Sequence, residues 1–169
     1  MSAMEYETVY HNFGPLYAPN SRVLLLGSMP SPKSREQGFF YGHPQNRFWR
    51  VLAAVLGQDT PRTIEDKRTL CVYHGIALWD VLASCDIVGA SDAAIKNPVA
   101  NDLRPILNTT QVRAIFTTGG TAWKFYHRLI EPVTGVPAGK LPSTSPANAA
   151  WSIERLTEAY RAALASYIE

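Results

Sequence analysis

Hydrophobic residues in this chain fall into short continuous runs, separated by longer stretches in which they recur at helical spacing. The runs have the length and composition of strands buried on both faces. Strands are predicted at residues 22–26, 76–82, 112–117 and 136–141. The alternation of strands and helices predicts an α/β fold, a three-layer α/β/α sandwich with a central, mostly parallel sheet of about four strands.

The predicted helices have recognisable boundaries. An apolar face with i, i+3 and i+4 spacing runs from Phe48 to Leu56, and Gly57 ends this helix. Thr60 and Pro61 have the residue types of an N-cap and a first helical position, which predicts a second helix from 61 to 74. Further helices are predicted to open at Asn97-Pro98, at Gly119-Gly120 and at Ser152.

Three segments lack such a pattern. Residues 1–21 contain turn signals and are expected to be loop-like, and residues 84–94 are expected to pack irregularly over the strand ends. Residues 27–49 are the most informative of the three, because Ser, Pro and Gly at their start favour neither helix nor strand. The loop also holds three consecutive aromatic residues, so we interpret it as an active-site loop rather than a disordered one.

Composition sets limits on the class of protein. With 169 residues, we expect residues 1–169 to form one domain with a single sizeable core. The net charge of +2 neither requires nor excludes a nucleic-acid partner. Cys71 and Cys85 lie in apolar stretches and are expected to be buried, reduced thiols. Because no signal peptide or long apolar run is present, we expect a cytoplasmic monomer with no membrane partner.

Several familiar kinds of site do not fit these residues. The loop after the first strand has neither the Lys-Ser/Thr ending of a P-loop nor a GxGxxG pattern. Histidines are scattered without metal-ligand spacing, so neither a metal nor another cofactor is expected, and no GxSxG elbow supports a serine triad. The groups that remain in the loop as candidates for ligand binding are backbone amides, aromatic rings, one His and one Asn. They suit a flat, neutral ligand that forms hydrogen bonds, such as a nucleobase.

Two motifs resemble the uracil-DNA glycosylase superfamily. Gly-Ser-Met-Pro-Ser at 27–31 and Gly-Phe-Phe-Tyr-Gly-His-Pro-Gln-Asn-Arg-Phe-Trp at 38–49 are similar to the first active-site motif of its mismatch-specific branch. Leu-Pro-Ser-Thr-Ser-Pro-Ala-Asn at 141–148 stands where the superfamily has its DNA-penetrating serine-proline loop. The resemblance extends over nearly the whole chain from residue 22 onward.

Two departures shift the resemblance toward another branch. Met29 stands where the mismatch branch has a water-positioning Asn, and Ser143 stands where the second motif has Asn or His. The resulting pattern looks like the hypoxanthine-DNA glycosylase branch, in which the catalytic Asn lies outside the first short motif. By position, that residue is Asn46. Asn46 is also well placed to cap the helix that follows, and the two roles can coexist.

The resemblance also implies residues that contact the substrate. Tyr41 is at the position that stacks on the base, although it could be a core aromatic, and His43 could merely brace the turn before Pro44. The hydroxyls of the serine-proline loop could likewise satisfy a tight turn. Base contacts are expected from Gly27, Ser28, Met29, Pro30, Ser34, Tyr41 and His43. DNA contacts are expected from Lys33, Arg47, Ser143, Thr144, Ser145, Pro146 and Asn148.

These expectations define a function with two alternatives. The resemblance implies a monofunctional, metal-free glycosylase that flips deoxyinosine out of duplex or single-stranded DNA and hydrolyses its N-glycosidic bond in base-excision repair. One alternative is excision of uracil, as in the mismatch branch. The other is a nucleic-acid-binding module that has kept the fold without the chemistry.

Overall fold

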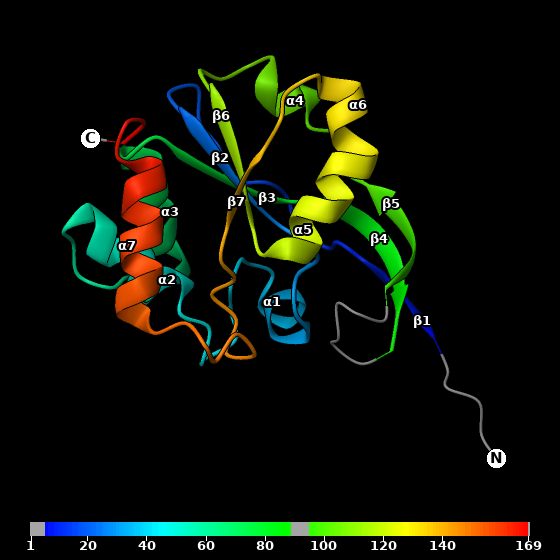
Figure 1. Ribbon diagram of the computed structural model, residues 1–169, viewed down its shortest axis with the longest axis horizontal. Coiled ribbons are helices and arrows are strands. Elements are labelled where there is room, and N and C mark those ends of the chain that lie inside the picture. Colours follow the sequence, from blue (N-terminus) through cyan, green and yellow to red (C-terminus); the bar gives the residue numbers. More distant parts are fainter. Residues whose placement is uncertain (1–5, 89–94, 169) are drawn as a thin grey trace.

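The computed structural model describes residues 6–88 and 95–168, and a four-stranded parallel sheet lies at its centre (Figure 1). Every pairing in this sheet is parallel. In spatial order the strands are β3 (Ile76–Asp80), β2 (Val23–Gly27), β6 (Ala114–Thr118) and β7 (Gly139–Leu141). The predicted α/β class and the four-stranded sheet are therefore confirmed.

The central strand β2 divides the hydrophobic core in two. Val23 and Leu25 face one core cluster, whereas Leu24 and Leu26 face the other, and all four side chains are fully buried. This burial on both faces is what the continuous apolar run predicts, because alternate residues of a strand point to opposite sides.

Helices cover both faces of the sheet. On the first face lie α2 (Phe48–Leu56), α3 (Ile64–Tyr73) and α7 (Ile153–Leu164), whose apolar residues join the cluster around Leu25. On the second face, α5 (Gly120–Phe125) continues through the π-helical turn η2 (Tyr126–Ile130) into α6 (Glu131–Thr134). Within the described residues, no helix is both long enough and apolar enough to cross a bilayer.

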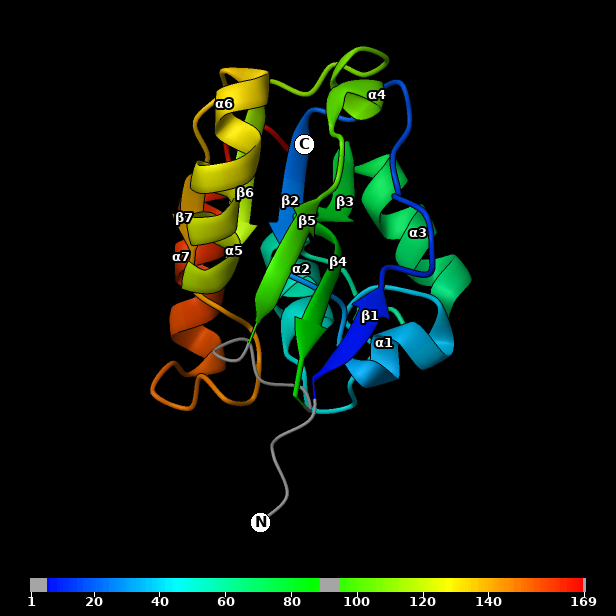
Figure 2. The ribbon, with the colours of Figure 1, turned by 90° about the vertical axis from the view of Figure 1, so that its right-hand side faces the viewer.

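A second, antiparallel sheet completes the cover of the second face. It consists of β1 (Glu7–Tyr10), β4 (Leu82–Ile87) and β5 (Lys96–Ala100), in the order β1-β4-β5. Figure 2 shows this small sheet beside α5 and α6, and its buried residues pack in the same core cluster as that helix. The predicted outer layer of helices is thus part helix and part sheet.

This small sheet corrects three predictions. The segment before residue 22 contains a strand, and the irregular segment predicted at 84–94 is a strand up to Ile87, while residues 89–94 lie outside the described residues. The helix predicted to open at Asn97-Pro98 is wrong, because Asn97 adopts a left-handed φ of 51° and bonds through its side chain to Asp86. Pro98 is tolerated on β5 because that strand is at the edge of the sheet.

The active-site loop also contains a helix that the prediction missed. Helix α1 (Pro32–Gln37) has Ser31 as its N-cap and ends at Gly38, which has a φ of 71°. Serine before proline and glycine after the last turn are ordinary helix boundary signals. They were outweighed by the density of Pro and Ser around them, which favoured a loop.

Two other helix starts were predicted with different success. The second predicted helix begins at Ile64 rather than at Pro61, because Thr63 accepts a hydrogen bond from the Asp66 amide and caps it. The last helix starts as predicted, since the Ser152 hydroxyl accepts from the Arg155 amide. Between β5 and β6 there is a short helix, α4 (Arg104–Leu107).

Candidate active site

A cavity of about 1330 Å³ opens at the carboxyl ends of the four parallel strands. Each strand contributes to its lining. Residues 27–30 begin at the last residue of β2, Asp80 ends β3, residues 118–121 begin at the last residue of β6, and residues 142–145 follow β7. Ligands in open α/β sheets bind at this edge. The cavity therefore lies at the ligand-binding edge of the sheet, and residues of both motifs line it.

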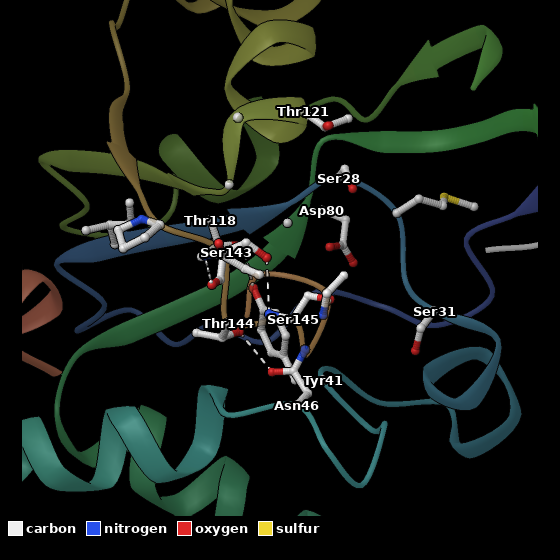
Figure 3. A pocket seen from close by; sticks show the side chains of 18 of the residues that line it. Ser28, Ser31, Tyr41, Asn46, Asp80, Thr118, Thr121, Ser143, Thr144 and Ser145 are labelled. Atoms are coloured by element: carbon white, nitrogen blue, oxygen red, sulfur yellow. Dashed lines mark hydrogen bonds between the residues drawn. The ribbon is translucent and has the colours of Figure 1, made fainter. Parts of the chain in front are cut away.

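Asn46 lies on this cavity at the start of α2. Its Oδ1 accepts two hydrogen bonds, from the Phe48 amide at 2.9 Å and from the Thr144 hydroxyl at 2.8 Å. These two donors occupy both lone pairs of the side-chain carbonyl. The amide oxygen therefore binds the first amide of α2, one residue before the N-cap Arg47, and links the two motifs, while the NH₂ group is left to offer to a ligand (Figure 3).

Tyr41 lines the same cavity and is held from two sides. Its ring stacks on Phe48 with a centroid separation of 3.9 Å, and its hydroxyl lies 3.2 Å from the Thr118 hydroxyl. The residue has a φ of 52°, which bulky side chains rarely adopt and which is often found at functional sites. Burial raises the pKa of the Tyr41 phenol well above its ordinary value, and the charge of Asp80 raises it further, so the phenol stays neutral.

The serine-proline loop is held by Arg47. The Arg47 guanidinium donates hydrogen bonds to the backbone carbonyls of Ser145 at 2.9 Å, Asn148 at 3.0 Å, and Thr144 and Trp151. Its own backbone amide also donates to the Thr144 carbonyl. Arg47 was expected to contact DNA, but these bonds direct its donors into the protein. A contribution to DNA binding would act through the loop that it shapes.

The loop hydroxyls have partners of their own. Ser143 Oγ accepts from the Ser145 amide and Ser145 Oγ accepts from the Ala147 amide, as in a tight turn. Asn148 donates back to the Ser143 carbonyl. These bonds agree with the interpretation that the hydroxyls satisfy a tight turn. Contact of these residues with DNA stays a prediction. Pro146 is exposed in the turn at the tip of this loop.

Of three other predicted residues, two form structural hydrogen bonds and one is exposed. His43 Nδ1 accepts from the Gln45 amide, which braces the turn, and His43 is not among the residues that line the cavity. The buried Ser34 hydroxyl accepts from the Gly42 amide and joins α1 to the aromatic segment. Lys33 is exposed on α1 beside Glu36. No finding tests a base contact by His43 or a DNA contact by Lys33.

The remaining base-binding candidates form the wall after β2. Gly27, Ser28, Met29 and Pro30 all line the cavity. Met29 also packs against the apolar cluster on the second face of the sheet, so its side chain is part of an apolar wall. The carbonyls of Gly27 and Ser28 accept hydrogen bonds from the amides of Val81 and Leu82, at the junction of β3 and β4. These bonds fix the backbone that faces the cavity.

Asp80 lines the cavity although it was not predicted to be a site residue. Its carboxylate is 2.7 Å from the ring of His11, and both side chains are almost fully buried. The position of Asp80 after an apolar strand was visible in the sequence, but it was equally compatible with a turn. The partner His11 gave no signal, because it lies in a segment without pattern and is far from Asp80 in sequence.

The donors around the cavity do not assemble a metal site. Among residues 6–88 and 95–168, no three His, Cys, Asp or Glu side chains are grouped so that they could hold a metal ion. The cavity lining instead offers hydroxyls, two primary amides, one carboxylate, two cationic side chains and aromatic rings to a ligand. Such a site binds by hydrogen bonding and stacking, which suits a nucleobase extruded from DNA.

The family match assigns this site to a class of enzyme. The family model described as Uracil DNA glycosylase superfamily matches residues 15–167. The chain belongs to this superfamily. It is thus a DNA glycosylase, an enzyme whose substrate is DNA.

Individual relatives agree with this assignment. The chain is similar to the hypoxanthine DNA glycosylase of Methanosarcina acetivorans, with 28% identity over 151 residues that cover 89% of this chain and 95% of the relative. It is 34% identical over 90 residues to the hypoxanthine DNA glycosylase of Methanosarcina barkeri, covering 53% of this chain and 57% of the relative. A solution NMR structure of a candidate uracil DNA glycosylase from Methanosarcina acetivorans superposes with a TM-score of 0.74 at 28% identity, covering 89% and 95% of the two chains.

Proposed function

We propose that this glycosylase removes hypoxanthine from deoxyinosine in DNA, as a first step of base-excision repair. The observation that carries this proposal is the Asn46 amide, whose oxygen is engaged by two donors while its NH₂ remains available at the cavity. Met29 adds support, because its apolar side chain cannot position water as a polar residue at that place could. The names of the two Methanosarcina enzymes support the same substrate.

The reaction begins with extrusion of the damaged nucleotide. Flipping a base out of the duplex costs a few kcal/mol, and less for a poorly paired base. The cavity of about 1330 Å³ has room for a purine with its sugar. In this proposal Tyr41 stacks on the flipped base, and the serine-proline loop takes a place near the DNA backbone, where small hydroxyl residues permit close approach to phosphates.

Bond cleavage then separates charge between sugar and base. As the N9–C1′ bond breaks, positive charge grows on the deoxyribose and negative charge grows on the purine. The Asn46 NH₂ donates a hydrogen bond to the departing purine and stabilises that negative charge. Water adds its oxygen to C1′, and a proton from water ends on the purine, which leaves as neutral hypoxanthine. The Asn46 carbonyl cannot also orient this water, because both its lone pairs are engaged.

An assay with defined lesions tests the substrate. The protein is incubated with labelled duplexes that contain one inosine, uracil, xanthine or ethenocytosine, and abasic sites are then cleaved with alkali. Strand cleavage is expected with inosine and much weaker cleavage with uracil. Equal or greater cleavage with uracil would replace the hypoxanthine assignment by a uracil-excising one. Gel retardation of inosine DNA without any abasic product would instead identify a binding module.

A further inference from the structure

Asp80 and His11 form a buried pair that the proposed mechanism leaves unused. His11 Nε2 lies 2.7 Å from Asp80 Oδ2, and the two side chains are 2% and 6% exposed. Asp80 lines the cavity, whereas His11 does not. Burial of a carboxylate is costly unless hydrogen bonds or an opposite charge compensate it. The ring N–H of His11 supplies this compensation to the carboxylate.

His11 is held rigidly for this task. Its backbone amide donates to the Ala83 carbonyl at 2.8 Å, and its ring packs against Trp79 and Phe13 with centroid separations of 4.3 Å and 4.5 Å. The second ring nitrogen, Nδ1, is buried without a hydrogen-bond partner in the described part of the chain. A buried nitrogen without a partner is unusual and calls for an explanation. The explanation here is that the ring is oriented so that its other nitrogen, Nε2, points at the Asp80 carboxylate.

The position of His11 in the chain makes this pair notable. It follows β1, whereas the family match begins only at residue 15. The segment after β1 therefore supplies a hydrogen-bond partner to Asp80 from outside the matched region. In Figure 3, Asp80 lies in the same cavity as Tyr41 and Asn46.

The second carboxylate oxygen lies at the cavity wall. Asp80 Oδ1 is so close to Gly27 that a Cβ atom there would lie 2.5 Å from it, and both residues line the cavity. An ionised carboxylate can only accept hydrogen bonds. It therefore favours a ligand that presents an N–H group and disfavours one that presents a lone pair.

This requirement separates two purines. Hypoxanthine carries a hydrogen on N1, whereas adenine has a lone pair on N1. We propose that Asp80 is the specificity-determining residue that accepts the N1–H of flipped hypoxanthine and rejects adenine, and that His11 is the positioning residue that orients its carboxylate. This inference rests on the proposed excision of hypoxanthine. Sites built around one substrate hydrogen bond discriminate strongly, because the analogue leaves a buried polar group without its partner.

The same charge has a consequence for rate. The base departs with negative charge, which a nearby carboxylate disfavours electrostatically. Asp80 thus raises the selectivity of the enzyme against normal adenine but slows the excision of hypoxanthine. An enzyme that searches DNA made largely of undamaged bases has reason to favour selectivity.

The test compares inosine and adenine in otherwise identical duplexes. Both are placed opposite cytosine, where adenine is the poorer partner and is extruded more easily, so a preference for inosine comes from the cavity. Asp80→Asn keeps the shape but can turn an NH₂ toward adenine N1. We expect this variant to lower the preference for inosine over adenine by at least about tenfold, in both single-turnover excision and duplex binding.

His11 variants test the positioning role. His11→Phe keeps an aromatic ring without an N–H and should lower the preference in the same direction, whereas His11→Gln, which restores an N–H donor, should recover part of it. Asp102→Asn and His127→Phe are matched controls, because both residues form exposed pairs elsewhere and should leave the preference unchanged. A structural role alone would lower activity on both bases equally and leave the ratio intact.

The outcomes are separable. An unchanged ratio in Asp80→Asn would overturn the inference even if hypoxanthine is excised normally. If the wild-type enzyme excises no hypoxanthine, the proposed function fails, and the binding ratio still decides the inference. Should Asp80→Asn fail to fold, wild-type protein is tested with 1-methylinosine, which lacks the N1 hydrogen. Equal excision and binding of inosine and 1-methylinosine would then contradict the role of Asp80.

Discussion

At the residue scale, one side chain combines two roles that the sequence presented as alternatives. The oxygen of Asn46 binds the first amide of α2 next to the N-cap Arg47, and the same geometry leaves its NH₂ at the cavity. A bond to the helix start was foreseeable from the residue type before the helix. The second donor, Thr144, was not, because it is far along the chain and only the folded sheet brings it near.

Replacing Asn46 by Asp should separate these roles. Asp preserves both accepted hydrogen bonds, so the melting temperature should hardly change, whereas Ala should lose about 0.5–2 kcal/mol of stability. Both variants remove the NH₂ donor, and each should slow single-turnover hypoxanthine excision by at least about tenfold, or about 1.4 kcal/mol in the barrier. Binding of inosine DNA should persist. Wild-type turnover by Asn46→Asp would make Asn46 a cap only.

Gly27 provides a second prediction at this scale. A Cβ atom at this position would lie 2.5 Å from Asp80 Oδ1, so Gly27→Ala should displace the carboxylate that His11 holds. Overpacking of this kind costs about 1–3 kcal/mol. We expect the preference for inosine over adenine to fall as well, which duplex cleavage assays measure. Gly14→Ala is the control, since no atom lies within 4 Å of a Cβ built there. If Gly27→Ala kept the wild-type preference for inosine over adenine, a displacement of the Asp80 carboxylate would have no effect on specificity.

At the scale of elements, the two motif loops are coupled by one arginine. The guanidinium of Arg47 bonds to backbone carbonyls of the serine-proline loop, so α2 sets the shape of a loop about a hundred residues away in sequence. From sequence, a basic residue between Asn46 and Phe48 in a glycosylase-like motif favoured a phosphate contact. That interpretation could not take account of carbonyl partners that only the fold supplies.

Salt dependence distinguishes these two roles for Arg47. Arg47→Ala should weaken duplex binding because the loop loses its support, yet the slope of log Kd against log salt concentration should stay unchanged. A residue that neutralises a phosphate behaves differently, and its loss lowers that slope by about one. Lys33→Ala, on the exposed surface of α1, is expected to show this lowered slope. A lowered slope for Arg47→Ala would indicate a direct phosphate contact.

The small antiparallel sheet shows why some elements escaped prediction. Val99, Leu103 and Ile106 have helical spacing, but Val99 is exposed on β5. The other two are buried at the N-cap of the short α4 and within it. The left-handed backbone of Asn97 and its hydrogen bond to Asp86 favour a strand over a helix in this segment. Such pairing of distant strands is a tertiary contact, and local periodicity gives no access to it.

At the scale of the whole molecule, the parallel sheet determines what meets at the active site. Apolar runs buried on both faces could be recognised as parallel strands, and that arrangement brings their carboxyl ends to a single edge. The cavity and both motif loops were predictable on this basis. The pair of Asp80 and His11 was not, because only the pairing of β1 with β4 brings His11 beside Asp80.

The chemistry available at this edge predicts that catalysis is independent of metal. Within residues 6–88 and 95–168, no cluster of three metal-ligating side chains is present, and the proposed mechanism stabilises the leaving purine through a neutral amide. Hypoxanthine excision should therefore survive prolonged treatment with EDTA followed by dialysis, with single-turnover rates within about twofold of the untreated enzyme, a barrier change well below 1 kcal/mol. A zinc-dependent nuclease treated in parallel verifies that chelation is complete. Loss of excision on chelation, with recovery on addition of zinc or magnesium, would show that a metal ion takes part in the reaction and that the neutral amide is insufficient.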